Sequence, residues 1–143
     1  MRALIDTCIV IDALQSRPGF AENAQKIFLL AANRKFTGYV TAKSVTDIYY
    51  IMHRHFHDDK QTRNVLNKLL ILFGIMDTAG EDCRQALLSK VSDFEDAVMI
   101  ETAKHFDADC IVTRNIKDYA KADITVYTPE EFIGLVRKED ETD

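Results

Sequence analysis

Three aspartates lie directly beside apolar runs, where an ionised carboxylate costs free energy unless it is paired or hydrogen-bonded. Asp6 follows the run Ala3–Ile5, Asp47 precedes IYYIM, and Asp96 precedes AVMI. If these acids converge, two unit charges about 4 Å apart repel by ~4 kcal/mol at an effective dielectric constant of about 20. A hard cation such as Mg²⁺ or Mn²⁺ relieves that repulsion through oxygen ligands. An ion so held can activate water for phosphodiester hydrolysis.

Each of these acids also has a structural interpretation. The patterns Ser44-x-x-Asp47 and Asp93-x-x-Asp96 resemble capping boxes, which stabilise the start of a helix and carry out no chemistry. Asp6 could likewise cap the helix that follows it. The sequence alone leaves both interpretations open.

The segments around these acids alternate between short apolar strands and longer helical patterns. Strands are predicted at 3–5, 39–41, 75–76, 110–112 and 124–127, and helices at 9–14, 22–34, 44–55, 60–73, 81–88, 93–106 and 128–137, with a helical turn at 116–119. This alternation predicts an α/β fold with a mainly parallel sheet of about five strands. Ligands of such sheets gather at the carboxyl ends of the strands, and Asp6 is predicted to lie there.

Length and composition predict one domain. The 143 residues are 47% hydrophobic and 29% charged, as in ordinary globular proteins. We expect a single domain over residues 1–137 and a disordered charged tail over 138–143. A membrane span is not expected, because no apolar run approaches about 18 residues. The start of the chain does not have the pattern of a secretion signal.

The cysteines and the net charge indicate the cellular compartment and the class of protein. Cys8, Cys83 and Cys110 are odd in number and scattered, which argues against a disulfide framework and for the reducing cytoplasm. The net charge of −5 argues against a protein that simply coats nucleic acid, since such proteins are usually basic. An enzyme whose carboxylates hold cations remains compatible with this charge.

Four segments, in this order and spacing, resemble the PIN-domain proteins, the fold of the VapC-type ribonuclease toxins. They are LIDTCIVIDAL at 4–14, SVTDIYYI at 44–51, DFEDAVMIETA at 93–103, and IVTRNIKDY to TPEEF within 111–132. The resemblance implies a three-layer fold around a central, mainly parallel sheet. It also implies an acidic pocket that binds one or two Mg²⁺ or Mn²⁺ ions and cleaves single-stranded or exposed RNA.

The resemblance assigns the acids position by position. Asp6 matches the first acid of the family and Asp96 the third, while Asp47 stands where the family usually has Glu. The fourth position falls near Asn115, which offers only an amide oxygen. The implied catalytic residues are Asp6, Asp47 and Asp96. The implied metal ligands are these three together with Asp93, Asn115 and Asp118.

Residues beside the proposed pocket are candidates for binding substrate. Arg114 and Lys117 could contact RNA phosphates and stabilise developing charge on phosphorus. Thr7 and Thr113 follow the first and fourth predicted strands and are predicted to bind substrate too. Cys8 stands where the family usually has Asn.

The resemblance also implies partners. A VapC-type toxin has a small antitoxin that blocks its pocket, and the family commonly forms homodimers, for which the helices predicted at 44–56 and 60–73 offer an apolar surface. Tyr49, Tyr50 and Phe56 could stack on bases, or belong to the core or a subunit interface.

Two other functions remain open. The first is a catalytically degenerate binding module for RNA or protein, since Asp47 and Asn115 depart from the family pattern. The second is an α/β phosphatase or phosphoacceptor with Asp6 as nucleophile. The absence of a second Asp two residues after Asp6 weighs against that reading.

Overall fold

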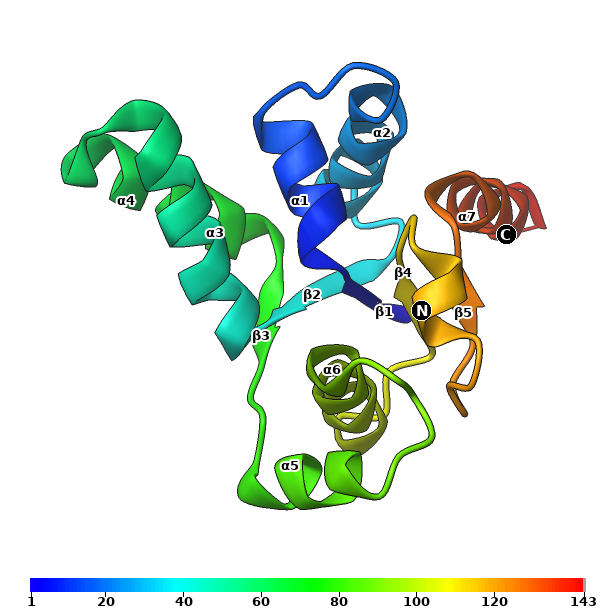
Figure 1. The fold of residues 1–143 in the computed structure, drawn as a ribbon. Helices are drawn as coiled ribbons and strands as arrows, with labels where there is room; N and C mark the ends of the chain where they lie inside the picture. The colour runs from blue at the N-terminus through cyan, green and yellow to red at the C-terminus, as the bar shows by residue number, and fades with distance from the viewer. Residues whose placement is uncertain (143) are drawn as a thin grey trace.

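The computed structural model describes residues 1–142 and contains a five-stranded, all-parallel sheet (Figure 1). The strands are β1 (Arg2–Ile5), β2 (Thr37–Thr41), β3 (Gly74–Met76), β4 (Cys110–Val112) and β5 (Val126–Tyr127), in the spatial order β3-β2-β1-β4-β5. The predicted α/β class and three-layer architecture are confirmed.

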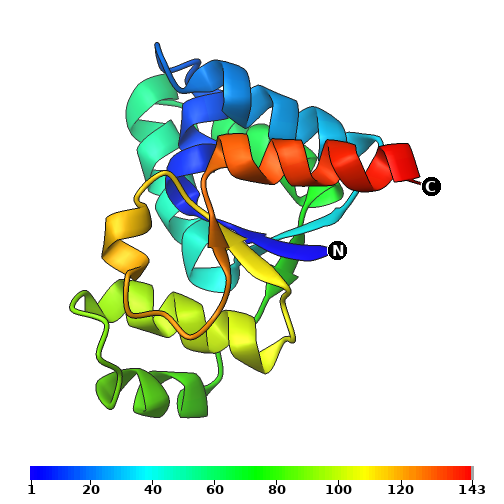
Figure 2. The same cartoon turned by 90° about the vertical axis from the view of Figure 1, so that its right-hand side faces the viewer.

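The helices cover both faces of this sheet, as Figures 1 and 2 show. They are α1 (Thr7–Leu14), α2 (Ala21–Ala32), α3 (Ala42–Phe56), α4 (Asp59–Leu72), α5 (Gly80–Leu87), α6 (Phe94–His105) and α7 (Pro129–Thr142), with a 3₁₀ turn η1 (Ile116–Tyr119). In Figure 1, α5 and α6 lie on one side of the sheet, and α1, α2, α3, α4 and α7 lie on the other.

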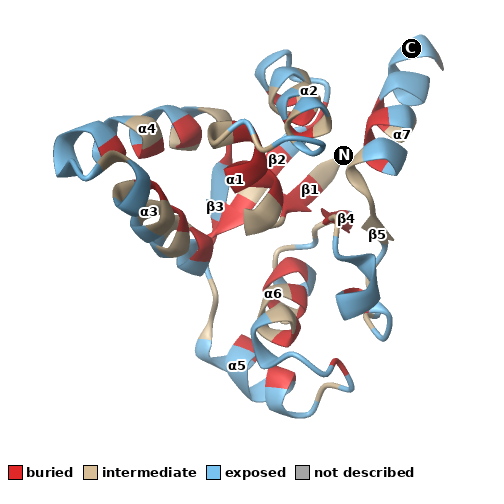
Figure 3. Ribbon diagram, turned by 45° about the horizontal axis from the view of Figure 1, so that its top comes forward, coloured by how far each residue is buried: buried red, intermediate tan, exposed pale blue. Residues whose placement is uncertain are grey.

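Successive side chains of β1 point to opposite faces of the sheet and belong to two separate core clusters. Ile5 packs with Ile9 and Ile27 beneath the larger helical layer, whereas Leu4 packs with Met76 and Ile100 beneath α5 and α6. The buried residues, red in Figure 3, follow this central sheet and the helix faces against it. Because helices cover β1 on both faces, its sequence contains a continuous run of apolar residues.

The register brings the candidate site to one edge of the sheet. Leu4 of β1 pairs with Tyr39 of β2 and with Ile111 of β4. The Asp6 amide then donates to the Val112 carbonyl at 3.0 Å, one residue beyond the end of β1. The chain therefore leaves the sheet at Asp6 directly beside the segment that follows β4.

The end of the chain departs from the sequence prediction. Helix α7 runs to Thr142 rather than ending near Arg137. No Gly or Pro interrupts the residues after Arg137, and Lys35 pairs with Asp140 at 2.9 Å. The division into a domain over 1–137 and a tail over 138–143 remains a prediction, and Asp143 lies outside the described residues. Within residues 1–142, no helix has the length and apolar character needed to cross a bilayer.

Gly38 is predicted to be required by packing. A Cβ added there would lie 2.5 Å from Cδ1 of the buried Phe73 side chain. We expect Gly38→Ala to lower the free energy of unfolding by about 1–3 kcal/mol through overpacking. The matched control is Gly134→Ala in α7, where a Cβ meets nothing within 4 Å and should add up to about 1 kcal/mol of helix stability. Urea unfolding of both variants measures the difference, and equal effects would contradict this packing account.

Candidate active site

A groove of about 370 Å³ opens at the carboxyl edge of the sheet. The turn after β1, helix α3 and the first turns of α6 supply its walls. Its lining residues are Asp6, Thr7, Lys43, Asp47, Tyr50, Ile51, Arg54, Glu95, Asp96 and Met99. The three aspartates singled out from the sequence thus line one groove, although they are 41 and 49 residues apart along the chain.

Asp6 occupies the N-cap position of α1 without capping it. Its side chain makes no hydrogen bond to the first turn of the helix. Its Oδ2 atom instead accepts a hydrogen bond from Thr113 Oγ1 at 2.7 Å and one from Cys8 Sγ at 3.5 Å. The capping interpretation therefore does not describe Asp6, whose carboxylate faces the segment that follows β4.

Asp96 also makes no capping bond, because Asp93 takes that role. The Asp93 side chain accepts from the Asp96 amide at 3.0 Å and caps α6. The Asp96 Oδ1 atom accepts from the Tyr119 hydroxyl at 3.3 Å. Asp93 thus fixes the start of the helix on which Asp96 is carried.

The pKa of Asp96 is changed by its burial and by the other acids nearby. It is raised to about 6, first by burial and then by the negative charges of Asp93, Asp6 and Asp118. None of these four carboxylates takes part in an ion pair with another residue of the part of the chain that the structure describes. Within residues 1–142 no lysine or arginine therefore forms a salt bridge with these acids, although the charge of Arg114 acts on Asp6 from a distance.

Asp47 lies in the same groove with a different partner. Lys43 Nζ is 2.8 Å from Asp47 Oδ2 and 2.8 Å from Glu95 Oε1, so one ammonium group links α3 to α6. The hydrogen bonds to these two carboxylates raise the pKa of Lys43. In this arrangement, no three His, Cys, Asp or Glu side chains within residues 1–142 are gathered closely enough to hold a metal ion. The metal-ligand set predicted from the sequence therefore remains a prediction.

Two predicted substrate-binding threonines are used within the framework of the site. Thr7 Oγ1 donates to Ser44 Oγ at 2.8 Å, and Ser44 lies 2.9 Å from Oγ1 of Thr41, which caps α3. Thr113 donates to Asp6 and accepts from the Asn115 amide at 3.1 Å. Hydroxyl groups therefore tie together the ends of β1, β2 and β4 at the groove.

Arg114 forms its ion pair with a buried acid rather than with an acid of the groove. Its Nε and Nη2 atoms donate to Asp12 at 2.8 and 3.3 Å, and Asp12 is only 1% exposed. The guanidinium carbon also lies 4.2 Å from the centre of the Phe20 ring. Lys117, by contrast, is exposed and forms no ion pair with any residue described. Of the two cations predicted to contact phosphate, Lys117 is the one whose charge is available.

Sequence reasoning missed two residues of this site. Tyr119, 3% exposed, reaches Asp96 from η1, and Ser44 joins Thr7 to Thr41 although the sequence suggested it as the start of α3. Helix α3 begins two residues earlier, at Ala42, so Asp47 is outside the predicted capping box. An aromatic residue within the polar segment NIKDY was the only signal for Tyr119.

The sequence model of the PIN domain matches residues 2–117. The chain belongs to the PIN-domain family. No curated protein matches it. Among solved structures, the PIN fold is shared with the toxins of VapBC complexes.

Three of these structures cover nearly the whole chain. DNA-bound VapBC from Salmonella typhimurium matches with 14% identity and a TM-score of 0.68, over 90% of this chain and 98% of that one. VapBC2 from Rickettsia felis, bound to a promoter DNA fragment, matches with 21% identity and a TM-score of 0.65 over 90% and 98%. A toxin–antitoxin complex from Klebsiella pneumoniae matches with 22% identity and a TM-score of 0.65 over 89% and 97%.

The donor set of this PIN domain suits a hard divalent cation. Asp6 and Asp96 offer carboxylate oxygens at the groove, and Asp93 and Asp118 add negative charge to the same place. Oxygen ligands favour Mg²⁺ or Mn²⁺ over softer metals. Burial is the main cause of the raised pKa of Asp96, and the neighbouring negative charges, which a bound cation would offset, add to it.

Without metal, Asp96→Asn should stabilise the protein in a pH-dependent way. The folded-state pKa of about 6 exceeds the ordinary value of 3.8, so the ionised carboxylate lowers stability. We expect Asp96→Asn in EDTA to raise the free energy of unfolding by about 1 kcal/mol above pH 6, after allowance for solvent screening. The gain should fade as the pH falls toward 4. Urea unfolding across this range, with exposed Asp77→Asn as the matched control, measures it. A gain independent of pH would contradict the raised pKa of Asp96.

The Asp12–Arg114 pair should matter more to stability than an exposed pair. Arg114→Gln leaves the buried Asp12 carboxylate with Arg17 alone, at 3.6 Å. Breaking a buried pair costs about 3–5 kcal/mol, and the partial exposure of Arg114 lowers our expectation to about 2–4 kcal/mol. Arg63→Gln, which breaks the exposed pair with Asp59, should cost under about 1 kcal/mol in the same urea experiment. Similar losses in the two variants would contradict a clamping role for Asp12.

Proposed function

We propose that this PIN domain is a Mg²⁺- or Mn²⁺-dependent endoribonuclease and the toxin of a toxin–antitoxin pair. The observation that carries the proposal is that Asp6, Asp47 and Asp96 line one groove, where burial, and after it the charges of the neighbouring acids, raises the pKa of Asp96. A set of charges left unneutralised in a groove is a feature of sites that bind a cation rather than of the core. The family of the chain and the toxin complexes with a similar fold support the same function.

In this proposal, Asp6 and Asp96 hold the ion, with Asp93, Asp118 and Asn115 nearby. The bound ion supplies an activated water and neutralises phosphate charge. Thr113 fixes the Asp6 carboxylate through its 2.7 Å hydrogen bond, and Tyr119 orients Asp96 from the other side. Asp47 contributes after it parts from Lys43. Lys117 contacts a phosphate of the RNA, whereas Arg114 holds the loop that carries Thr113.

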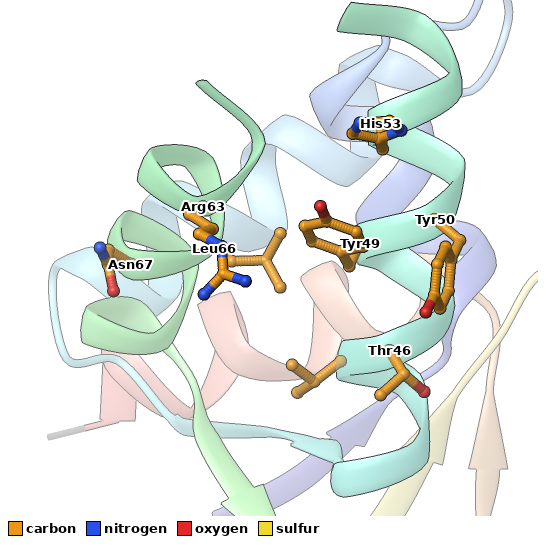
Figure 4. Close-up of a pocket in the computed structure, with 8 residues that line it drawn as sticks. Thr46, Tyr49, Tyr50, His53, Arg63, Leu66 and Asn67 are labelled. Carbon is orange, nitrogen blue, oxygen red and sulfur yellow. The ribbon is translucent and has the colours of Figure 1, made fainter. Parts of the chain in front are cut away.

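The proposed antitoxin blocks the acidic groove, as the family resemblance implies, whereas a second copy of the chain needs surface outside it. Helices α3 and α4 frame a hollow of about 620 Å³ (Figure 4). Its lining combines apolar Val45 and Leu66 with polar Arg63 and Asn67. In the Klebsiella structure a similar fold is part of a toxin–antitoxin complex, which supports an antitoxin for this chain. The hollow between α3 and α4 is the surface that we propose for dimerisation.

The direct test is metal-dependent cleavage of single-stranded RNA. We expect cleavage with Mn²⁺ or Mg²⁺, none in EDTA, and a loss of at least about 100-fold in kcat/KM for Asp6→Asn and for Asp96→Asn, because each removes a ligand charge. Glu22→Gln, which alters only a surface pair with Lys26, is the control.

The alternative is a non-catalytic module, and the same samples distinguish it. RNA binding without cleavage in either metal, with the unfolding temperature unchanged on addition of Mn²⁺, would contradict the ribonuclease proposal and favour the binding module.

A further inference from the structure

One face of α3 extends the acidic groove beyond the proposed metal ligands. Lys43, Asp47, Tyr50, Ile51 and Arg54 all line the groove. Their spacing of three and four residues places them along a single stripe of the helix. The stripe rises about 16 Å along the axis from Lys43 to Arg54. This length extends past a single reacting phosphate to its neighbours.

Tyr50 presents an aromatic ring to solvent in this stripe. Its exposed fraction is 64%, and its hydroxyl makes no hydrogen bond with the rest of the described chain. The adjacent Tyr49 is used differently, since its hydroxyl donates to Asp59 of α4. Figure 4 shows the Tyr50 ring on the side of α3 away from Arg63 and Asn67 of α4. Tyr50 also contacts the Tyr49 ring, with centroids 5.2 Å apart, and lines the hollow between α3 and α4, but these contacts leave it largely exposed.

Arg54 brings a positive charge to the same end of the groove. It is exposed, and its polar contact is a 3.5 Å hydrogen bond from Nε to the Tyr50 carbonyl. No carboxylate within residues 1–142 pairs with it, although the chain carries a net charge of −5 and Lys43 bridges two acids in the same groove. A guanidinium group left without a carboxylate in an acidic protein suits a phosphate ligand.

We propose that Tyr50 and Arg54 form a nucleotide subsite. Tyr50 stacks on an unpaired base next to the scissile phosphate, and Arg54 binds the phosphate of a neighbouring nucleotide. This inference rests on the proposed ribonuclease function and adds which residues of α3 bind the nucleotides beside the scissile phosphate. Bases within a duplex are stacked on one another and offer no free face to a tyrosine ring.

The order of groups along α3 favours RNA over a protein ligand. Asp47, Tyr50 and Arg54 follow one another along the axis of α3 at rises of about 4.5 and 6 Å. A carboxylate, an aromatic ring and a guanidinium group therefore lie in this order along one side of the helix. All three residues line the groove that contains Asp6 and Asp96. A polyanion whose scissile phosphate lies at the acids therefore reaches both Tyr50 and Arg54.

The test is RNA binding in a full-length Asp6→Asn background, so that cleavage does not interfere. Fluorescence anisotropy with a labelled single-stranded 12-nucleotide RNA in Mg²⁺ gives the affinity, with about 12 nucleotides chosen to cover the groove. Tyr50→Ala should bind about 5- to 100-fold more weakly, and Tyr50→Phe should bind as the parent does. Arg54→Gln should bind more weakly and reduce the salt dependence by about one charge. The matched controls on α2 are Leu29→Ala at an exposed position and Lys26→Gln, which removes a surface ion pair with Glu22, and both should have no effect.

Each result bears on the subsite separately from the chemistry. Tyr50-dependent binding of single-stranded RNA, with weak binding of the corresponding duplex, supports the subsite even if the otherwise unaltered chain cleaves nothing. Cleavage by the unaltered chain together with unchanged RNA affinity in Tyr50→Ala overturns the subsite and leaves the ribonuclease proposal intact. Equal binding of duplex and single strand, no RNA binding at all, or loss of a protein partner without loss of RNA binding in Tyr50→Ala also overturns it.

Discussion

Burial and mutual repulsion of carboxylates at one edge of the sheet are the constraint on which the rest of this site depends. Burial first, and then the negative charges of Asp93, Asp6 and Asp118, raise the pKa of Asp96 to about 6. Folding must hold these groups close at a cost in stability. The hydrogen bond from Thr113 to Asp6 and the one from Tyr119 to Asp96 keep the acids in place. This is the pattern expected where structure is retained for a ligand rather than for stability.

The scaffold around the acids is built from pairs that do no chemistry themselves. Buried Asp12 fixes Arg114, and Arg114 is the residue directly after Thr113. On the other wall, Lys43 joins Asp47 to Glu95 and thereby links α3 to α6. A positive charge close to Asp47 weakens its repulsion from the other acids. The groove therefore contains two kinds of acid. Hydrogen bonds hold Asp6 and Asp96 in place, whereas Lys43 partly neutralises the charge of Asp47.

The sequence predicted most of the fold and the identity of the central acids. Apolar runs bounded by polar residues predicted β4 at Cys110–Val112 with both of its bounds, and the alternation of strands and helices predicted the parallel sheet. The resemblance to PIN domains implied that Asp6 and Asp96 share an acidic pocket, and both line the same groove. The sequence did not predict the partners of the side chains. Arg114 was predicted to bind substrate because the sequence gives no sign of its ion pair with Asp12, which is 102 residues away. Likewise, the residue pattern around Asp47 does not indicate whether its side chain faces Asp6 or Lys43.

The central claim is that Asp6 and Asp96 share one hard cation, and a crystal structure of the unaltered chain grown with Mn²⁺ tests it most directly. Anomalous scattering at the manganese edge locates the ion independently of any assumption about ligands. The account predicts a peak at the groove with carboxylate oxygens of both Asp6 and Asp96 within about 2.0–2.6 Å, the range of hard-cation ligation. A peak elsewhere, or a groove in which both carboxylates contact only protein groups and water, would contradict it.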